Sequence, residues 1–200
     1  MEIFHNLIDK VFSNSYVFDR FRDLVHSNYK GEKRIILKYF DKNRLTLDFG
    51  CGAGQFSVLF NPNKYYGVDT DKKYVKFSKE KRKGNFSIIK ESPPYDFNKN
   101  YFDQILISAV IHHIDDGNLK IISKELKRIL KTNGRLMIVD HFRKENQGNL
   151  ICKGLIFLDR GRFFRDLDQA IKVFSKEFKV EKTEIFKNGP YKDYILILSK

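Results

Sequence analysis

The sequence predicts an α/β fold in which a mostly parallel sheet carries helices on both faces. Short apolar runs are found at residues 45–49, 65–69, 86–90, 102–108 and 134–140. Amphipathic stretches lie between them at 54–60, 71–83 and 117–131. This alternation indicates a parallel sheet, because parallel neighbours need a crossover connection that is usually helical. With 200 residues and 42% hydrophobic composition, the chain is long enough for one domain with a real core.

The two ends of the chain differ from this middle part. Residues 2–42 read as helical, with the segment 32–40 as the last helix before the first strand. The tail, from about residue 167 to 200, reads as one helix and two strands around Asn188, Gly189 and Pro190. Strands joined by so short a turn must be antiparallel. Residues 142–166 hold no clear regular element, and so long a connection often marks a lid or a binding segment.

The composition limits the function classes without choosing one. The net charge is +13, with 38 basic against 25 acidic residues, which is compatible with an anionic partner such as nucleic acid. The alternative is a solvated lysine-rich surface, since no block of five basic residues occurs. The two cysteines, Cys51 and Cys152, are too few for a disulfide framework or a tetrahedral zinc site. We find no secretion signal and no apolar run of membrane-spanning length, and therefore expect a cytoplasmic protein.

A glycine-rich loop follows the first expected strand, in the sequence LDFGCGAGQF (47–56). A dinucleotide-binding fingerprint would need glycine where Gln55 stands, and the Gly-Lys-Ser/Thr ending of a phosphate-binding loop is missing. What remains is Asp48 followed by Gly50, Gly52 and Gly54 in the spacing D-x-G-x-G-x-G. This pattern resembles motif I of the class I S-adenosylmethionine-dependent methyltransferases. A tight strand-to-helix turn without a ligand is the alternative.

The resemblance implies a three-layer Rossmann-like methyltransferase fold with a mostly parallel seven-stranded sheet, an antiparallel C-terminal hairpin and an N-terminal helical cap. One domain is expected, divided into the cap (1–42), the cofactor-binding core (43–141), a lid or substrate loop (142–166) and the final helix with its hairpin (167–200). The implied cofactor is S-adenosylmethionine. Asp48 would hold its ammonium directly or through water, and the glycines let the backbone come close. Amide groups at the start of the next helix would favour its carboxylate.

Further positions fit the same resemblance. Asp69 ends the second strand and would accept the ribose hydroxyls, whereas Asp71 would cap the next helix. Polar residues after the third strand would meet the adenine, and the turn after the fourth strand would line the methionine end. The expected cofactor-binding residues are Asp48, Gly50, Cys51, Gly52, Gly54, Asp69, Thr70, Glu91, Ser92, Ser108 and Ala109.

The tetrapeptide SPPY (92–95) is similar to a motif of enzymes that methylate exocyclic amines of bases. In those enzymes the motif ends the fourth strand, and its aromatic residue stacks on the flipped base. Here the tetrapeptide follows the third strand instead. We therefore interpret Pro93, Pro94 and Tyr95 as a rigid turn. The fourth strand ends in SAVIHHID, which looks like methyltransferases that act on small molecules.

Four residues at the ends of the fourth and fifth strands are candidates for a catalytic base: His112, His113, Asp140 and His141. Histidine titrates near neutrality, which suits proton transfer, and ligands of open α/β sheets bind at this edge. The alternatives are a histidine that packs near the site and orients a helix, and an Asp140 that caps a loop. No metal is expected, because adjacent histidines rarely point at one ion.

The connecting segment 142–166 concentrates arginine, which suits contacts with carboxylates or phosphates. The expected substrate-binding residues are Tyr16, Arg143, Arg160 and Arg162, with Lys144 and Arg165 as further members of this basic loop. A solvated lid is the alternative. The preferred acceptor is a small molecule. An RNA or protein acceptor, or a non-catalytic cofactor-binding module, are the other hypotheses.

Overall fold

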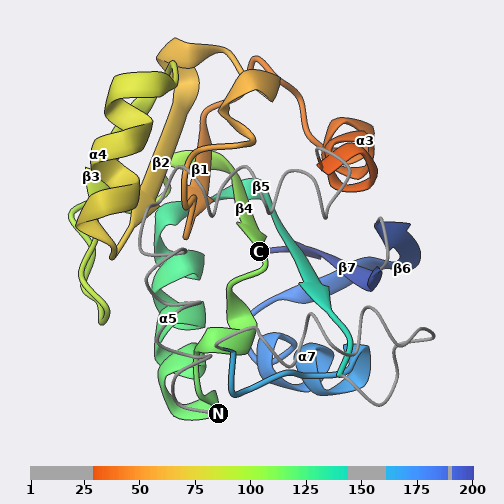
Figure 1. Ribbon diagram of the computed structural model, residues 1–200. Helices are drawn as coiled ribbons and strands as arrows, with labels where there is room; N and C mark the ends of the chain where they lie inside the picture. The colour runs from red at the N-terminus through yellow and green to blue at the C-terminus, as the bar shows by residue number, and fades with distance from the viewer. Residues whose placement is uncertain (1–28, 144–160, 189–190) are drawn as a thin grey trace, which may run out of the picture.

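The computed structural model describes residues 29–143, 161–188 and 191–200, and within them seven strands form one sheet in the order β3-β2-β1-β4-β5-β7-β6 (Figure 1). The strands are β1 (Thr46–Phe49), β2 (Tyr65–Asp69), β3 (Asn85–Ile88), β4 (Phe102–Ser108), β5 (Leu130–His141), β6 (Lys179–Asn188) and β7 (Tyr191–Ser199). Neighbours from β3 to β5 are parallel, and β7 runs antiparallel between β5 and β6. The predicted fold class, with its antiparallel C-terminal pair, is confirmed.

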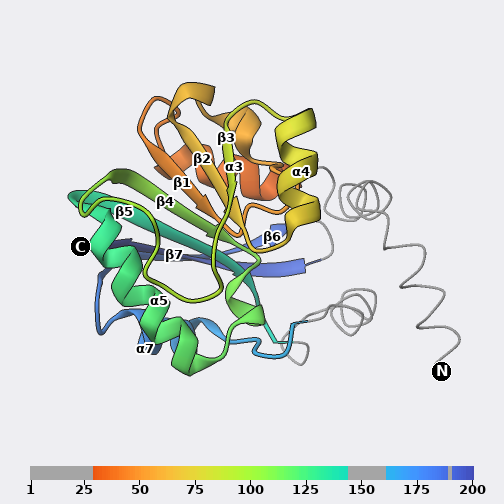
Figure 2. The ribbon, with the colours of Figure 1, turned by 90° about the vertical axis from the view of Figure 1, so that its left-hand side faces the viewer.

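Helices cover both faces of the sheet. They are α3 (Lys30–Tyr39), α4 (Lys72–Lys81), α5 (Asp116–Ile129) and α7 (Leu167–Phe174). Figure 2 shows α3 and α4 on one face and α5 and α7 on the other. Each strand supplies both layers because successive side chains point to opposite faces. Leu47 and Ile105 belong to the apolar layer under α5 and α7, whereas Tyr65 and Leu106 belong to the layer under α3 and α4.

Two side-chain caps set where the helices begin at the carboxyl edge of the sheet. Asp71 precedes α4, and its carboxylate accepts the amide of Lys73 at 2.7 Å. Asp115 precedes α5 and accepts the amides of Gly117 and Asn118. Such caps satisfy amide groups that have no partner within the helix. The capping role predicted for Asp71 is confirmed.

The helix predicted over 54–60 is wrong, because this stretch forms turns and a single 3-10 turn, η2 (Ser57–Leu59). Phe56 and Phe60 are both buried in the layer under α3 and α4, although they stand at helical spacing. The chain then turns again at Asn61, whose side chain accepts the amide of Asn63 and starts η3 (Pro62–Lys64). The glycine loop is therefore not followed by an α-helix whose amino end faces a ligand.

Part of the predicted cap and lid lies outside the described residues. The cap is described from residue 29 onward, where α3 confirms the helix predicted over 32–40. Tyr16, Lys144, Cys152 and Arg160 lie outside. Among the described residues, no helix combines the length and the apolar character that crossing a membrane requires.

Candidate functional site

The glycine loop adopts a backbone shape that side chains would oppose. Gly50, Gly52 and Gly54 have φ angles of +77°, +51° and +71°, in the left-handed region. A Cβ at Gly50 would lie 2.5 Å from Cγ2 of Val110, and a Cβ at Gly54 would lie 2.9 Å from Cε1 of Phe86. Glycine is therefore required both by conformation and by neighbours. The loop wraps closely over the carboxyl end of β1.

Hydrogen bonds fasten this loop to the end of β2. The amides of Gly50 and Cys51 donate to the carbonyl oxygen of Val68 at 2.8 and 3.0 Å. The amide of Gly52 donates to Oδ2 of Asp69 at 2.8 Å, and the amide of Asp71 donates to Oδ1 of Asp69 at 2.9 Å. A carboxylate offers about four acceptor sites. The half-exposed Asp69 therefore keeps further acceptor capacity beside the loop, and its contact with the ribose hydroxyls stays a prediction.

Asp48 lies beneath the loop rather than on its surface. Its carboxyl is 1% exposed, and Oδ2 accepts the hydroxyl of Tyr65 at 2.5 Å. Burial raises the pKa of Asp48 to about 7, although the hydrogen bond from Tyr65 works in the opposite direction. Asp48 thus supports the loop from below. A contact between its carboxyl and the cofactor's ammonium stays a prediction.

Cys51 holds the glycine loop in place through its backbone amide, because its side chain is buried in the core. A Cβ at Gly67 would lie 3.0 Å from Sγ of Cys51, so the thiol fills the space that this glycine leaves. Burial raises the pKa of Cys51, and the negative charges of Asp48 and Asp69 raise it further. The side chain is therefore a packed thiol and not a reactive one.

The segment after β3 separates into an exposed and a buried part. Glu91 and Ser92 are exposed, and their contact with adenine stays a prediction. Tyr95 is 4% exposed and packs on Phe49 with ring centroids 5.5 Å apart. Its amide donates to Oε1 of Glu125 at 2.9 Å. Because Tyr95 belongs to the core, it is not placed to stack on a flipped base, which agrees with the interpretation of this tetrapeptide as a turn.

A buried histidine–carboxylate pair lies where β4 and β5 end. Ala109, just after β4, has a φ of +55°, which is unfavourable for a residue with a Cβ, and its amide donates to Val139. This bend leads into the 3-10 turn η4 (Ile111–His113). His112 on that turn is 1% exposed, and its Nδ1 lies 2.5 Å from Oδ1 of Asp140 at the end of β5.

The contact with Asp140 decides which ring nitrogen of His112 carries the proton. Burial alone would raise the pKa of Asp140, but the contacts with His112 and His141 prevail and lower it. An ionised Asp140 accepts the proton on Nδ1, so Nε2 is the basic nitrogen of a neutral His112. The ring of Phe164 stacks on His112 with centroids 4.7 Å apart and planes 4° apart. His112 is therefore held in one orientation.

A second histidine–carboxylate pair lies on the other side of β5. Nδ1 of His141 is 2.6 Å from Oδ1 of Asp193 on β7, and Nδ2 of Asn188 donates to the other oxygen of Asp193. Burial lowers the pKa of His141, but Asp193 overcomes this effect and raises it to about 9. At neutral pH His141 is therefore a cation rather than a base. Its ring centroid is 5.7 Å from that of His112.

The structure separates the candidates that the sequence grouped together. His112, Asp140 and His141 meet at the carboxyl edge, whereas His113 beside them is exposed. Asp193 was missed by sequence reasoning. The available signal was one acidic residue within the apolar strand YKDYILIL. Its pairing opposite His141 depends on the register of β5 and β7, which only the structure supplies.

The expectation for Arg165 is wrong, because this side chain is structural. Arg165 is 5% exposed, and its Nε and Nη2 donate to Oδ1 of Asp116 at 2.8 and 2.6 Å. It also donates to the carbonyl oxygens of Ile111 and Ile114 at 2.6 and 2.7 Å. These bonds fasten the end of the segment 142–166 to η4 and to the start of α5. Arg143 and Arg162 are exposed.

Comparisons with known proteins agree with this geometry. Residues 47–138 match the methyltransferase domain family. An uncharacterized methyltransferase of Bacillus subtilis is 34% identical over 109 residues, which cover 50% of this chain and 42% of that protein. A ubiquinone biosynthesis O-methyltransferase of Pelagibacter ubique is 33% identical over 102 residues, which cover 48% and 42%. The chain thus spans less than half the length of these curated relatives.

Solved structures extend the likeness to nearly the whole fold. A crystal structure of a SAM-dependent methyltransferase from Archaeoglobus fulgidus superimposes with a TM-score of 0.74 at 18% identity, covering 92% of this chain and 99% of that one. The sheet order, the glycine loop with Asp69 beside it and the family match all lead to one assignment. Residues 47–138 match the methyltransferase domain family, and the chain shares the fold of S-adenosylmethionine-dependent methyltransferases.

Proposed function

We propose that this protein transfers a methyl group to a small-molecule acceptor and that His112 is its general base. The observation that carries the proposal is the buried His112–Asp140 pair, 2.5 Å apart, where β4 and β5 end. Ligands of open α/β sheets bind at this edge. The Pelagibacter ubique relative, named as an O-methyltransferase of ubiquinone biosynthesis, supports a small acceptor with an oxygen nucleophile.

The cofactor would lie along the glycine loop. Asp69 would accept the ribose hydroxyls, with Thr70 beside it, and Ser108 and Ala109 would line the methionine end. Glu91 and Ser92 would meet the adenine. Bound S-adenosylmethionine supplies a methyl group that is already activated by a sulfonium leaving group. The remaining task of the protein is alignment, exclusion of water and removal of a proton from the acceptor.

Asp140, His112 and His141 have different roles in removing the acceptor's proton. Asp140 holds the Nδ1 proton of His112, which leaves Nε2 to take the acceptor's proton. His141 contributes a fixed positive charge, and its ring centroid lies 5.7 Å from that of His112. Arg143 and Arg162 lie in the described parts of the segment 142–166 and would contact an anionic group of the acceptor. Tyr16 and Arg160 remain candidates outside the described residues.

The decisive experiment compares substitutions of two neighbouring histidines. Methyl-labelled cofactor is incubated with a metabolite extract and, separately, with an RNA pool, using wild type, His112→Gln and His113→Gln. We expect label in the metabolite fraction, and a loss of at least about 100-fold in His112→Gln, because general bases contribute on that scale. His113→Gln should stay within a few-fold of wild type. Both variants must still bind S-adenosylhomocysteine.

Other outcomes contradict the proposal in distinct ways. Full activity in His112→Gln would remove the general base but leave the methyltransferase. Label found in the RNA pool alone would replace the small-molecule acceptor with RNA. Cofactor binding without label in any fraction would favour the non-catalytic module.

A further inference from the structure

The basic charge of the chain is concentrated on one short segment. Residues 72–90 contain eight basic residues and one acidic residue, Glu80, which amounts to +7 of the chain's +13. Most of them belong to α4 or follow it directly. We call the exposed lysines of this helix and its end the α4 basic surface: Lys72, Lys73, Lys76, Lys79, Lys81 and Lys83.

These lysines are exposed, and none forms an ion pair among the described residues. Some lysines elsewhere are paired with an acidic side chain. Lys38 pairs with Glu184 at 2.9 Å, and Lys131 pairs with Asp103 at 2.9 Å. Within residues 29–143, 161–188 and 191–200, no acidic side chain neutralises the α4 basic surface by an ion pair.

This arrangement opposes the local stability of α4. The first turn contains Lys72 and Lys73 and no acidic residue, although the amino end of a helix favours negative charge. Lys72 and Lys76 are four residues apart and Lys76 and Lys79 three apart, at spacings where like charges repel by a few tenths of a kcal/mol. A surface that breaks several local rules at once is typical of a functional site.

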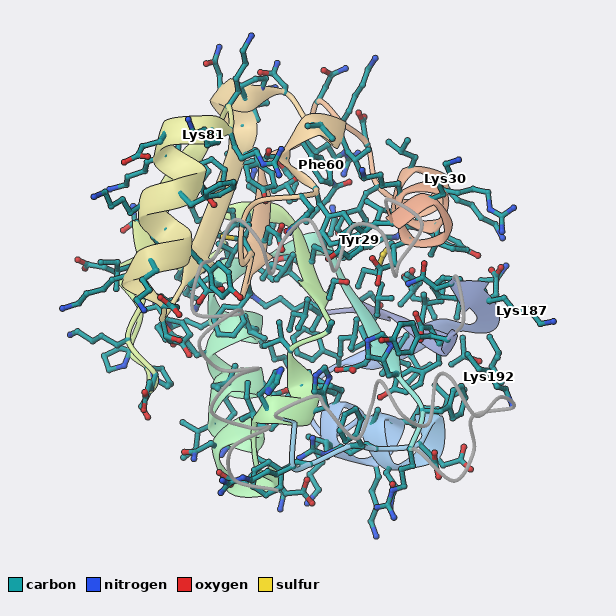
Figure 3. All side chains as sticks on the ribbon, in the orientation of Figure 1. Tyr29, Lys30, Phe60, Lys81, Lys187 and Lys192 are labelled. Atoms are coloured by element: carbon teal, nitrogen blue, oxygen red, sulfur yellow. The ribbon has the colours of Figure 1, made fainter. Side chains whose placement is uncertain are left out.

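The geometry favours a nucleic acid over a membrane. Lys72, Lys76 and Lys79 form one row along α4, about 10 Å long at 1.5 Å per residue. The side of α4 with Val75 and Ser78 is buried against the sheet, so the helix has no apolar face left for lipid. Figure 3 shows nitrogen-tipped side chains that project from α4 away from the sheet, with Lys81 at its far end. Lysine is a compact point charge that suits phosphate groups.

The α4 basic surface is separate from the proposed acceptor site. α4 packs beside β3, the edge strand, whereas His112 and Asp140 lie at the ends of β4 and β5, beyond β1. The surface begins three residues after Asp69, at the carboxyl edge of the sheet. A strand bound there would pass beside the proposed cofactor site without occupying the acceptor's place.

We propose that the α4 basic surface binds nucleic acid through its phosphate backbone, without reading the bases. Phosphate contacts from lysine give affinity that falls steeply with salt and carry little sequence information. Because lysine does not contact the 2′-hydroxyl in this mode, RNA and DNA of one sequence should bind within about threefold of each other. The proposal does not depend on the nature of the methyl acceptor.

The test measures fluorescence anisotropy of a labelled single-stranded RNA of about 20 nucleotides. Wild type is compared with Lys72→Gln/Lys76→Gln/Lys79→Gln and with a control of equal charge, Lys120→Gln/Lys124→Gln/Lys176→Gln. The control lysines are exposed and lie on α5 and directly after α7. Calorimetry with S-adenosylhomocysteine checks that both variants keep their fold.

We expect the α4 variant to weaken RNA binding at least about tenfold and to lower the salt slope by about 2, at roughly 0.7 per phosphate contact. The control should change affinity less than threefold. Equal losses in both variants would show attraction by net charge alone and overturn the proposal. Unchanged binding in the α4 variant, or equally tight binding to polyglutamate or to vesicles with anionic lipids, would also overturn it. Absence of methyl transfer would leave these outcomes unaffected.

Discussion

Replacing Asp48 with asparagine should make the stability of the protein less sensitive to a rise in pH from about 5 to 8. Burial raises the pKa of Asp48 from its ordinary value of 3.8 to about 7. A carboxyl whose pKa is raised on folding stabilises the fold below its unfolded pKa, and that contribution is lost as the pH rises through the folded pKa. The loss therefore occurs between about pH 4 and pH 7. Asparagine keeps the shape and an oxygen for the Tyr65 hydroxyl but carries no charge.

The magnitude follows from the pH interval. Between pH 5 and the folded pKa near 7 lie about two pH units at 1.36 kcal/mol each, or about 3 kcal/mol. Urea unfolding at pH 5 and pH 8 should show that wild type loses about 3 kcal/mol more than Asp48→Asn. Other titrating groups contribute equally to both proteins, so the difference isolates Asp48.

A second variant checks the direction of this effect. Tyr65→Phe removes the only hydrogen bond described for the Asp48 carboxyl in the part of the chain covered by the structure. Because that bond favours the ionised carboxyl, Tyr65→Phe should lose more stability at pH 8 than at pH 5. If wild type and Asp48→Asn have parallel pH profiles, the buried acid is not the source of the loss of stability with rising pH and the reasoning fails.

Three further outcomes follow from the site. Asp193→Asn should lower the pKa of His141 from about 9 to below 7, as measured by ¹⁵N NMR titration of the imidazole, and a value still near 9 would contradict the assigned ion pair. Since that raised pKa stabilises the fold below about pH 6.5, with the benefit lost towards pH 9, the variant should also have a flatter stability profile across this range. Gly50→Ala should destabilise the fold by about 1–3 kcal/mol in thermal unfolding, and Val110→Ala in the same chain should restore part of that loss, because Cγ2 of Val110 blocks the added methyl group. Arg165→Leu should cost about 3 kcal/mol in urea unfolding, since three carbonyl groups lose their donor. A cost below about 0.5 kcal/mol would show that Arg165 is not structural.

The sheet was predictable from the sequence because its strands are short apolar runs separated by helical patterns. The antiparallel tail was predictable because Asn188, Gly189 and Pro190 allow only a short turn. The stretch 54–60 was not. Its apolar residues have helical spacing, but Phe56 and Phe60 fill the core from a chain that turns at Gly54 and again at Asn61. Local periodicity does not report such tertiary packing.

The part of the site that the glycine loop forms was predictable, because its shape depends on backbone conformation. Glycines spaced after a strand predict a close loop, and an acid at the end of the next strand predicts Asp69 beside it. The partners of the histidines were harder to predict, since the separation of Asp140 from His112 in sequence is bridged only by the register of β4 and β5. Arg165 was misjudged because an arginine in a loop suggests a side chain that is available to a ligand. In the structure it is buried and donates to one carboxylate and three backbone carbonyl groups.

The placement of S-adenosylmethionine along the glycine loop is most directly tested by calorimetry with S-adenosylhomocysteine. Wild type is compared with Asp69→Ala, Asp69→Asn and, as a matched control, Asp71→Ala, which removes only the cap of α4. We predict micromolar binding in wild type, a loss of at least about tenfold in both Asp69 variants, since hydrogen bonds to charged groups contribute about 1.5–3 kcal/mol, and less than threefold change in Asp71→Ala. No binding in wild type, or unchanged binding in both Asp69 variants, would contradict the placement of the cofactor.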